Sequence, residues 1–260
     1  MDSEVRTVRR GAVLEVTLDR PKANAIDAPT SRRMGEVFAG FRDDPNLRVA
    51  IVTGGGERFF SAGWDLKSVA EGEAPDFDFG VGGFGGLQEL PGLDKPVIAA
   101  VNGMAVGGGF ELALSADLIL ASEQARFALP EINAGTLADA ATIKLPRRMP
   151  YHVAMELLFT GRWMEAAEAR QWGLVNEILP AEGLMARARA LADLLAEGPP
   201  LVFAAVKEVA RRTETLPVQQ AFDLVNSRKL KTVATLYDSE DMKEGARAFA
   251  EKRKPVWKGR

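Results

Sequence analysis

Three consecutive glycines, Gly107-Gly108-Gly109, deliver a carboxylate, Glu111, into an otherwise apolar run that extends from Val101 to Leu114. Glycines let a backbone pass close to a ligand and expose its N–H groups, and the first turn of the helix expected next offers further unpaired N–H donors. The segment therefore favours binding of an anion or oxyanion. Apolar neighbours would raise the pKa of Glu111, which predicts an acid or a base. The alternative is a Gly-rich packing crossover in which Glu111 is only a charge at a helix start.

The remaining composition limits which groups could do chemistry. The chain has no cysteine, which excludes disulfides, thiolate metal sites and a cysteine nucleophile. Its one histidine, His152, cannot supply a set of imidazoles for a metal, and we interpret it as structural. An enzyme built from this chain would therefore use carboxylates as its acid and base, and no cofactor or metal is expected.

Charge and hydropathy exclude two classes of partner. The net charge is −3 with both signs mixed along the chain, which leaves no basic surface typical of nucleic-acid binding. The longest apolar stretch, Val97 to Ala121, contains Asn102, Glu111 and Asp117, which would be costly in a bilayer. The N-terminal residues are charged throughout and lack the apolar core of a secretory signal, so we expect a cytoplasmic protein without a membrane partner.

Periodicity predicts an α/β core. The residues that read as β-strands are Ala12 to Leu18, Val49 to Thr53, Val97 to Val101 and Leu118 to Ala121. The helical pattern from Thr30 to Phe41 separates the first two of these, which indicates a β-α-β unit with parallel strands. A chain of 260 residues with 47% hydrophobic residues can bury one large core or a core with a smaller appendage.

From Tyr151 onward the pattern is mostly helical, and we expect no strands in the last quarter. The predicted helices are Val153 to Thr160, Ala166 to Trp172, Gly183 to Ala196, Pro200 to Arg212, Pro217 to Tyr237 and Ser239 to Glu251. The C-terminal helices are amphipathic but too few for a large core of their own, which favours packing on another surface or subunit. We therefore predict a core of residues 1-195 and a helical oligomerisation region of residues 196-260.

The segment Gly80 to Gly85 matches the dinucleotide-binding pattern GxGxxG literally. It follows Pro75-Asp76-Phe77-Asp78-Phe79 instead of a hydrophobic strand, and its two aspartates would repel a pyrophosphate. We interpret it as a flexible loop.

Several stretches together resemble the crotonase (enoyl-CoA hydratase/isomerase) superfamily across essentially the whole chain. These are RPKANAID, FFSAGWDL from Phe59, KPVIAAVNGMAVGGGFELAL from Lys95, FALPE from Phe127 and the terminal FAEKRKPVWKGR. The loops AEGEAPDFDFG and GGFGGL are more similar to one branch of that superfamily, the carnitinyl-CoA dehydratases. The resemblance implies a spiral of ββα turns and a C-terminal helical region that builds trimers, often paired into hexamers.

The resemblance also implies a reaction and its residues. Water is added or removed across the α,β bond of an acyl-CoA, which in the branch just named is crotonobetainyl-CoA or carnitinyl-CoA. An ordinary short-chain enoyl-CoA hydratase or isomerase is the alternative. A further alternative is that the chain is a non-catalytic relative of these enzymes. By position, the backbone N–H groups of Trp64 and Gly108 would form an oxyanion hole for the thioester oxygen. Glu111 and Glu131 match the two catalytic carboxylates, and we expect the pair to hold one proton at neutral pH.

Residues near these motifs would contact the substrate or its coenzyme A portion. By analogy with the family they are Lys22, Ala23, Ala25, Ala62, Gly63, Asp65, Leu66, Gly107, Pro130, Gly135, Phe249 and Lys252. Because a carnitine-like substrate carries a trimethylammonium group, aromatic residues beside carboxylates could bind it. The candidates are Trp64, Phe77, Phe79 and Phe84 with Asp76 and Asp78, and the alternative is that these rings only pin a mobile loop.

One segment departs from the family pattern. These hydratases usually read Gly-x-x-Pro, then Asp or Gly, then a Gly-Gly pair, whereas this chain runs Gly135-Thr136-Leu137-Ala138-Asp139-Ala140-Ala141-Thr142. It lacks the proline and the glycine pair and is one residue shorter. Alanine does not readily adopt a left-handed backbone, and its Cβ atoms would enter near the acyl group, so we expect an altered acyl pocket.

Overall fold

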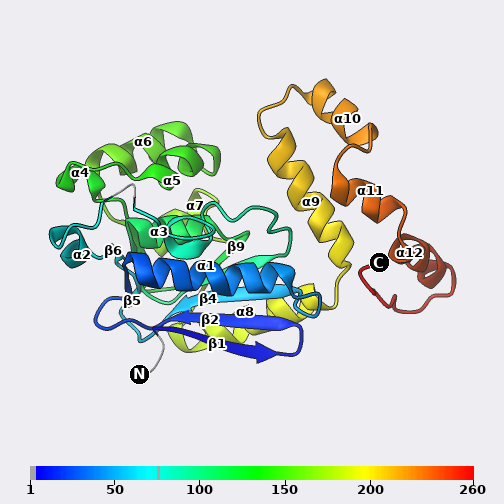
Figure 1. Cartoon of the computed structure of the whole chain (residues 1–260), viewed down its shortest axis with the longest axis horizontal. Coiled ribbons are helices and arrows are strands. Elements are labelled where there is room, and N and C mark those ends of the chain that lie inside the picture. Colours follow the sequence, from blue (N-terminus) through cyan, green and yellow to red (C-terminus); the bar gives the residue numbers. More distant parts are fainter. Residues whose placement is uncertain (1–3, 75–76) are drawn as a thin grey trace. The chain divides into compact units, whose positions relative to one another are not determined.

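The chain consists of two compact units (Figure 1). The computed structural model describes residues 4–74 and 77–260. The first unit comprises the described residues up to Leu93 together with Val97–Ala192, and the second comprises Asp94–Pro96 and Asp193–Arg260.

A six-stranded sheet forms the base of the first unit. Its strands, in spatial order, are β1 (Val5–Arg10), β2 (Val13–Leu18), β4 (Val49–Gly54), β7 (Val97–Val101), β9 (Leu118–Ser122) and β12 (Glu177–Leu179). Only β1 and β2 pair antiparallel, and the other neighbours are parallel. Strands β4 and β7 are buried along their whole length, as their continuous apolar sequences require. The four strands expected from periodicity are thus confirmed.

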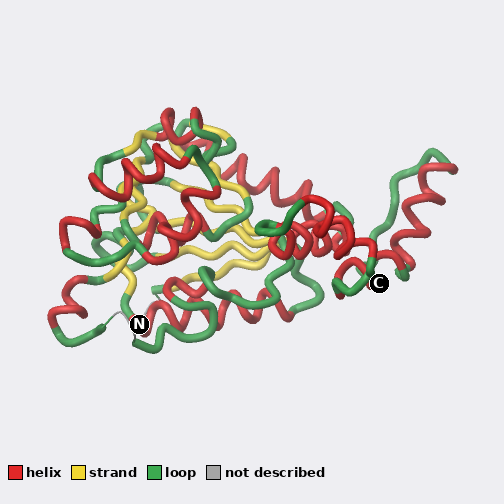
Figure 2. Tube along the Cα trace, turned by 90° about the horizontal axis from the view of Figure 1, so that it is seen from above, coloured by secondary structure: helices red, strands yellow, loops and turns green. Residues whose placement is uncertain are grey.

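A second sheet of four short strands lies alongside in the same unit. Its order is β11 (Met164–Glu165), β10 (Arg126–Ala128), β8 (Met104–Val106) and β5 (Phe59–Ser61), and a separate pair is formed by β3 (Ala25–Ile26) and β6 (Gly63–Trp64). In the tube of Figure 2 the strands of the first unit run side by side with helices around them.

The two sheets are built by a repeated ββα unit. A long strand (β4, β7, β9) is followed in the chain by a short one (β5, β8, β10) and then by a helix: α2 (Leu66–Ala70), α3 (Gly108–Leu114) or α4 (Glu131–Ala134), with β6 inserted before α2 in the first repeat. Since the long strands are neighbours in one sheet and β5, β8 and β10 are neighbours in the other, successive repeats stack on one another as a spiral. This confirms the ββα spiral that the resemblance implied.

Helix α1 (Ala28–Asp43) connects β3 to β4 and begins two residues before the expected start at Thr30. The carboxylate of Asp27 accepts a hydrogen bond from the Thr30 N–H at 2.9 Å, and a proline lies in the first turn. These are favourable features for a helix N-terminus. The β-α-β unit predicted from β2, α1 and β4 is parallel, as expected.

The segment that matches GxGxxG packs on α1 and ends in a short 3₁₀ helix, η1 (Phe84–Gly86). The Ser31 hydroxyl donates to the Phe79 carbonyl oxygen at 3.0 Å and accepts from the Gly85 N–H at 2.9 Å. Gly86 lies so close to the backbone of Gly35 that a Cβ atom would overlap it. The segment is neither a strand-to-helix phosphate loop nor a loosely attached loop.

The remaining helices of the first unit and their bounds follow the chain. They are α5 (Asp139–Lys144), the 3₁₀ helix η2 (Leu145–Arg147), α6 (Tyr151–Thr160), α7 (Ala166–Gln171) and α8 (Ala181–Ala196), whose last turn passes into the second unit. The part after Tyr151 is mostly helical as expected, although the short strands β11 and β12 interrupt it.

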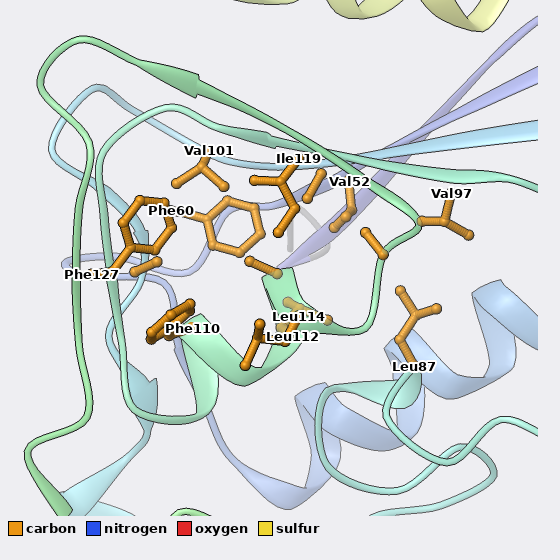
Figure 3. Close-up of a cluster of buried hydrophobic side chains, with 14 of the residues drawn as sticks. Val52, Phe60, Leu87, Val97, Val101, Phe110, Leu112, Leu114, Ile119 and Phe127 are labelled. Atoms are coloured by element: carbon orange, nitrogen blue, oxygen red, sulfur yellow. The ribbon is translucent and has the colours of Figure 1, made fainter. Parts of the chain in front are cut away.

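The apolar core of the first unit joins α3 to the sheets (Figure 3). Phe110 and Leu114 on α3 are at most 3% exposed and lie on the side of the helix that faces strand residues such as Val101 and Ile119. Leu112 is fully buried on the other side, next to Gly85. At about 25 cal/mol per Å² of apolar surface, burial of each such side chain contributes roughly 1.5–3 kcal/mol, which fixes the helix firmly.

The second unit contains α9 (Pro200–Thr213), α10 (Val218–Asn226), α11 (Lys231–Tyr237) and α12 (Glu240–Ala250), and no strand occurs within it. Its own core is small and centres on Ala205, Leu230 and Val233. The single helix expected from Pro217 to Tyr237 is wrong, because the chain leaves the helical conformation after Asn226 and Arg228 adopts a left-handed φ of 55°. No helix in the described ranges is both long and apolar enough to span a bilayer.

Candidate active site

The short parallel strands β5, β8 and β10 end at the same edge of their sheet, and each leads into a segment with a predicted site residue. Val106 at the end of β8 pairs with Ala128 at the end of β10, and the Gly107 N–H donates to the Ala128 carbonyl oxygen at 2.9 Å. Glu111 follows Val106 by five residues and Glu131 follows Ala128 by three. This register explains how residues separated by twenty positions reach one place.

Both glutamates line one cavity of about 740 Å³. The predicted residues Trp64, Gly108 and Gly135 line it as well. Of the other predicted contacts, Gly107 and Pro130 lie directly beside lining residues in the chain without lining the cavity themselves. His152 is exposed, contacts the Tyr151 ring and is not part of this cavity.

Glu111 lies in the first turn of α3 and is only 7% exposed. Its Oε1 accepts a hydrogen bond from the Ala141 N–H at 2.8 Å. Burial raises the pKa of Glu111, the charge of Asp139 raises it further, and the Ala141 N–H opposes both by stabilising the ionised form. Glu111 is therefore a carboxylate held in a fixed orientation and made more basic by its surroundings.

Glu131 is the first residue of α4 and follows Pro130, which occupies the N-cap position. Its Oε2 is buried and has no hydrogen-bond partner among the described residues. Burial raises the pKa of Glu131 to about 7, and the nearby charge of Glu111 contributes in the same direction. A carboxyl group that titrates near neutrality can take up and release a proton under ordinary conditions.

Glycines are required where three backbone segments converge on these carboxylates. A Cβ atom on Gly63 would lie 2.7 Å from the Gly108 nitrogen and 2.6 Å from the Val106 oxygen. The peptide between Gly63 and Trp64 therefore passes directly against the first turn of α3. A Cβ atom on Gly107, whose φ is 52°, would overlap Glu131 Oε1. The glycine run thus allows close approach of backbone and carboxylate, as its sequence indicates.

The predicted coenzyme A segments are adjacent to one another. Ala25 pairs with Gly63 in the β3–β6 ladder, and the Ala62 N–H donates to the Ala23 carbonyl oxygen at 2.9 Å. The chain therefore brings the segment from Lys22 to Ala25 next to the segment from Ala62 to Leu66. The Leu66 side chain is 69% exposed and available to a ligand.

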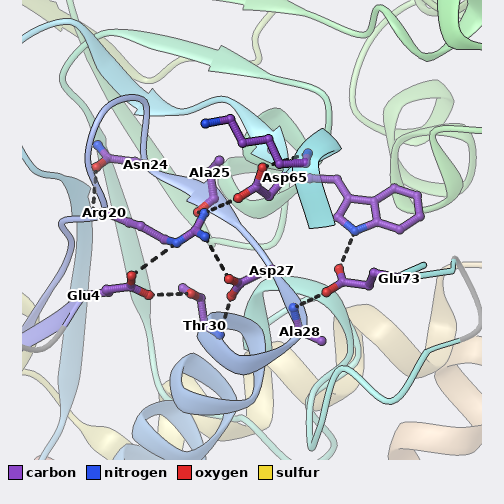
Figure 4. A network of polar contacts seen from close by, with 12 residues as sticks. Glu4, Arg20, Asn24, Ala25, Asp27, Ala28, Thr30, Asp65 and Glu73 are labelled. Carbon is purple, nitrogen blue, oxygen red and sulfur yellow. Dashed lines mark hydrogen bonds and ion pairs between the residues drawn. The ribbon is translucent and has the colours of Figure 1, made fainter. Parts of the chain in front are cut away.

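Asp65 has a structural task within this region (Figure 4). Its carboxylate binds Arg20 at 2.6 Å and also caps α2 by accepting from the Lys67 N–H at 3.0 Å. Arg20 in turn binds Asp27 and Glu4. This network holds β3 and β6 together beside the cavity. Phe249 and Lys252 belong to the second unit, where Phe249 is 87% exposed, and their role toward coenzyme A stays a prediction.

The aromatic residues near Trp64 form a chain of edge contacts. Ring centroids of Trp64 and Phe79 lie 6.3 Å apart and those of Phe79 and Phe84 lie 5.4 Å apart. The Trp64 indole N–H donates to Glu73 at 2.5 Å, a contact drawn at the Glu73 label in Figure 4. These three rings, Phe77 and Asp78 line the cavity, whereas Asp76 lies outside the described residues.

The departure between Gly135 and Thr142 forms helix α5 and the loop before it. Only Gly135 in this run has a left-handed backbone, with φ 68°. Ala138, Ala140 and Ala141 are buried away from the cavity, so the expectation that alanine Cβ atoms enter the acyl region is wrong. The wall of the cavity is instead formed there by Thr136, Leu137 and Asp139.

Sequence reasoning missed the residues on α5 that surround Glu111. Lys144 donates to the Ser115 hydroxyl at 2.9 Å and to the Gln88 carbonyl oxygen at 3.2 Å, and burial lowers its pKa while the charge of Glu111 opposes that shift. The signal that could have found it is a lysine directly before the apolar turn at Leu145, one helical turn after Ala141. Within the described residues, no group of three or more His, Cys, Asp or Glu side chains is arranged to hold a metal ion.

Comparison with known proteins agrees with this geometry. The sequence model of the enoyl-CoA hydratase/isomerase family matches residues 9–260. Proteins named carnitinyl-CoA dehydratase from Citrobacter koseri and Proteus mirabilis are each 57% identical to this chain over 261 residues, and the matches cover 100% of both chains. The chain belongs to the enoyl-CoA hydratase/isomerase family. The crotonase resemblance stated from sequence is thereby confirmed, together with its similarity to the carnitinyl-CoA dehydratase branch.

Solved structures of the enoyl-CoA hydratase/isomerase family share this fold. A crystal structure of enoyl-CoA hydratase from Mycobacterium tuberculosis H37Rv superposes with a TM-score of 0.89 at 39% identity, covering 99% of each chain. An enoyl-CoA hydratase subunit from Geobacillus kaustophilus superposes with a TM-score of 0.86 at 36% identity over 99% of each chain. The α/β crotonase-like fold expected from the sequence is confirmed.

Proposed function

We propose that this protein is an acyl-CoA hydro-lyase that adds or removes water across the α,β bond of a CoA thioester. The observation that carries the proposal is the pair Glu111 and Glu131, which line one cavity beside a glycine-rich helix start. Burial raises the pKa of both carboxyl groups, and the charge of Glu111 raises the pKa of Glu131 further. Family membership supports the same reaction class.

The backbone beside the carboxylates supports the electrostatic part of the reaction. Addition of water at the β-carbon moves charge onto the thioester oxygen, which becomes an enolate. The N–H groups of Trp64 and Gly108 come from two segments in direct contact, and each donor of this kind stabilises such charge by about 3–4 kcal/mol. These donors need no rearrangement during the reaction because buried neighbours fix α3.

The environments of the two glutamates support different roles. Glu111 accepts an N–H bond that favours its ionised form, so we assign it as the base that removes a proton from the attacking water. Glu131 has a buried Oε2 without a partner and a pKa of about 7, so we assign it as the acid that protonates the α-carbon. One turnover leaves the proton on Glu111, and its return to Glu131 resets the pair. Dehydration is the same sequence in reverse.

The names of the relatives direct the choice of substrate. Because the 57% identical proteins are named carnitinyl-CoA dehydratase, we propose crotonobetainyl-CoA and carnitinyl-CoA as the unsaturated and hydrated partners. The cavity supports a cationic acyl group, since aromatic rings and carboxylates line it. Coenzyme A would lie along the paired segments from Lys22 to Ala25 and from Ala62 to Leu66, with Phe249 and Lys252 as further contacts.

The reaction is tested by following loss of the conjugated enoyl thioester absorbance with crotonobetainyl-CoA and crotonyl-CoA. We expect turnover of both, with crotonobetainyl-CoA preferred. E111Q and E131Q should each lower kcat by about 100-fold or more, as loss of a general acid or base does, while coenzyme A affinity changes little. E36Q, which changes a surface carboxylate on α1, serves as the control and should keep full activity. Full activity in E111Q or E131Q would refute the two-carboxylate mechanism.

We also propose that the second unit mediates assembly into a homotrimer, or a hexamer of paired trimers. Large apolar side chains on its helices are exposed in the single chain, including Val206 at 60%, Val218 at 74% and Phe222 at 59%. Light scattering after size-exclusion chromatography would give the mass of the particle. A monomer at micromolar concentration would contradict this proposal.

A further inference from the structure

The proposed reaction uses two of the carboxylates that line the cavity and leaves three unused. Glu111 and Glu131 perform the proton transfers, whereas Asp78, Glu89 and Asp139 have no role in them. None of the described residues that line the cavity is a lysine or an arginine. An ordinary acyl chain has no charge to match such a wall, and extra carboxylates would make an anionic enolate harder to form. A cationic acyl group would compensate for that charge.

Asp139 is the one of the three that lies closest in the chain to the proposed reaction centre. It is the first residue of α5, and Ala141, two residues later in the same helix, donates its N–H to Glu111 Oε1 at 2.8 Å. Its charge contributes to the raised pKa of Glu111. Asp139 is exposed to the cavity, whereas its neighbours Ala138 and Ala140 are buried. Its carboxylate is therefore available to a ligand while its backbone is fixed.

The chemistry of a trimethylammonium substrate requires a counter-charge at this place. In crotonobetainyl-CoA the ammonium nitrogen is attached to the γ-carbon, two bonds from the β-carbon that receives water. Since Glu111 must reach that water, the cation has to lie beside Glu111. A quaternary ammonium cannot donate an N–H hydrogen bond, so attraction by a nearby carboxylate and by aromatic faces must hold it.

We propose that Asp139 is a specificity-determining residue that selects acyl-CoA substrates with a cationic group next to the β-carbon. This inference rests on the proposed hydro-lyase function and adds the residue that distinguishes a betaine substrate from a neutral one. Phe84, which lines the same cavity and packs against the start of α3, supplies an aromatic surface to the same group. Asp139 acts on the substrate by charge and does not transfer a proton.

The test compares D139N with wild type on crotonobetainyl-CoA and crotonyl-CoA, which share coenzyme A and the reacting bond. We expect kcat/KM for crotonobetainyl-CoA to fall about tenfold more than kcat/KM for crotonyl-CoA, because the effect of Asp139 on the Glu111 pKa acts on both substrates alike. D139E, which keeps the charge, should retain the preference for the betaine substrate. An equal loss on both substrates would overturn the inference and leave the hydro-lyase function standing. A wild-type protein inactive on both would refute the function itself and this inference with it.

A measurement on the wild-type protein tests the same inference if D139N does not fold. Added salt screens charge, so KM for crotonobetainyl-CoA should rise more steeply with sodium chloride than KM for crotonyl-CoA. The coenzyme A portion contributes equally to the salt dependence of KM for both substrates. The difference between the two salt dependences therefore reports on the ammonium group. The same salt dependence for the two substrates, or turnover of crotonyl-CoA alone, would overturn the assignment of Asp139.

Discussion

Replacement of Gly107 by alanine should damage the reaction more than the fold. Gly107 has φ 52° and ψ −126°, a conformation that costs a residue with a side chain about 1–3 kcal/mol. In addition, the new methyl group would overlap Glu131 Oε1, so the carboxylate has to move. A displacement of about 1 Å at a reacting group can reduce turnover by roughly 100-fold. We therefore expect G107A to fold with reduced stability and to lose about two orders of magnitude in kcat.

The matched control is G11A in the turn between β1 and β2. Gly11 has a similar φ of 59°, but a Cβ atom there would meet no other atom within 4 Å. G11A should lose about 1–2 kcal/mol from the left-handed backbone alone and keep full turnover. Urea unfolding measures the stability of both variants, and the hydration assay measures kcat. If G107A turned over substrate as fast as G11A, Glu131 would not act from the position described here.

Three further predictions concern protonation. The pKa of Glu131 is raised to about 7, so the folded protein holds a proton that the unfolded chain releases near pH 4.5. The free energy of unfolding therefore falls as the pH rises between these two values. E131Q lacks this titration, so its free energy of unfolding relative to wild type should be higher at pH 8 than at pH 5. Urea unfolding at the two pH values measures this difference, and the same difference at both would contradict the raised pKa. Because hydration needs protonated Glu131, kcat for hydration should decline above about pH 7, and a flat profile up to pH 9 would exclude Glu131 as the acid. The Lys144 charge favours ionised Glu111, so K144M should move the acidic limb of the kcat profile to higher pH and K144R should restore it; an unmoved limb in K144M would remove Lys144 from the site.

The long elements could be predicted because their sequences carry strong local signals. Strands β4 and β7 are continuous apolar runs with clear ends, and the helical pattern after Thr30 predicts α1, although not its start two residues earlier with Asp27 as the N-cap. The glycine run before Glu111 indicated close backbone approach, which Gly63 and Gly107 make in the structure. In each case the physical cause lies within a few residues of the feature itself.

The second sheet could not be predicted from local pattern because its strands are too short. Strands β8 and β10 have three residues each, which is less than two periods of alternation. Yet the pairing of Val106 with Ala128 is what brings Glu131 to Glu111. Only the family resemblance supplied that contact in advance. The break between α10 and α11 was missed for a related reason, because neither glycine nor proline marks it.

Helix α5 forms part of the cavity wall, whereas strands β8 and β10 precede the helices that carry Glu111 and Glu131. These are separate parts of the chain, which affects how substrate range can change. A one-residue insertion in β8 or β10 would shift the pairing of Val106 with Ala128 and so displace the segments that carry Glu111 and Glu131. The run from Gly135 to Thr142 belongs to neither strand. Engineering of new acyl selectivity would therefore best exchange residues in this run and leave the two short strands untouched.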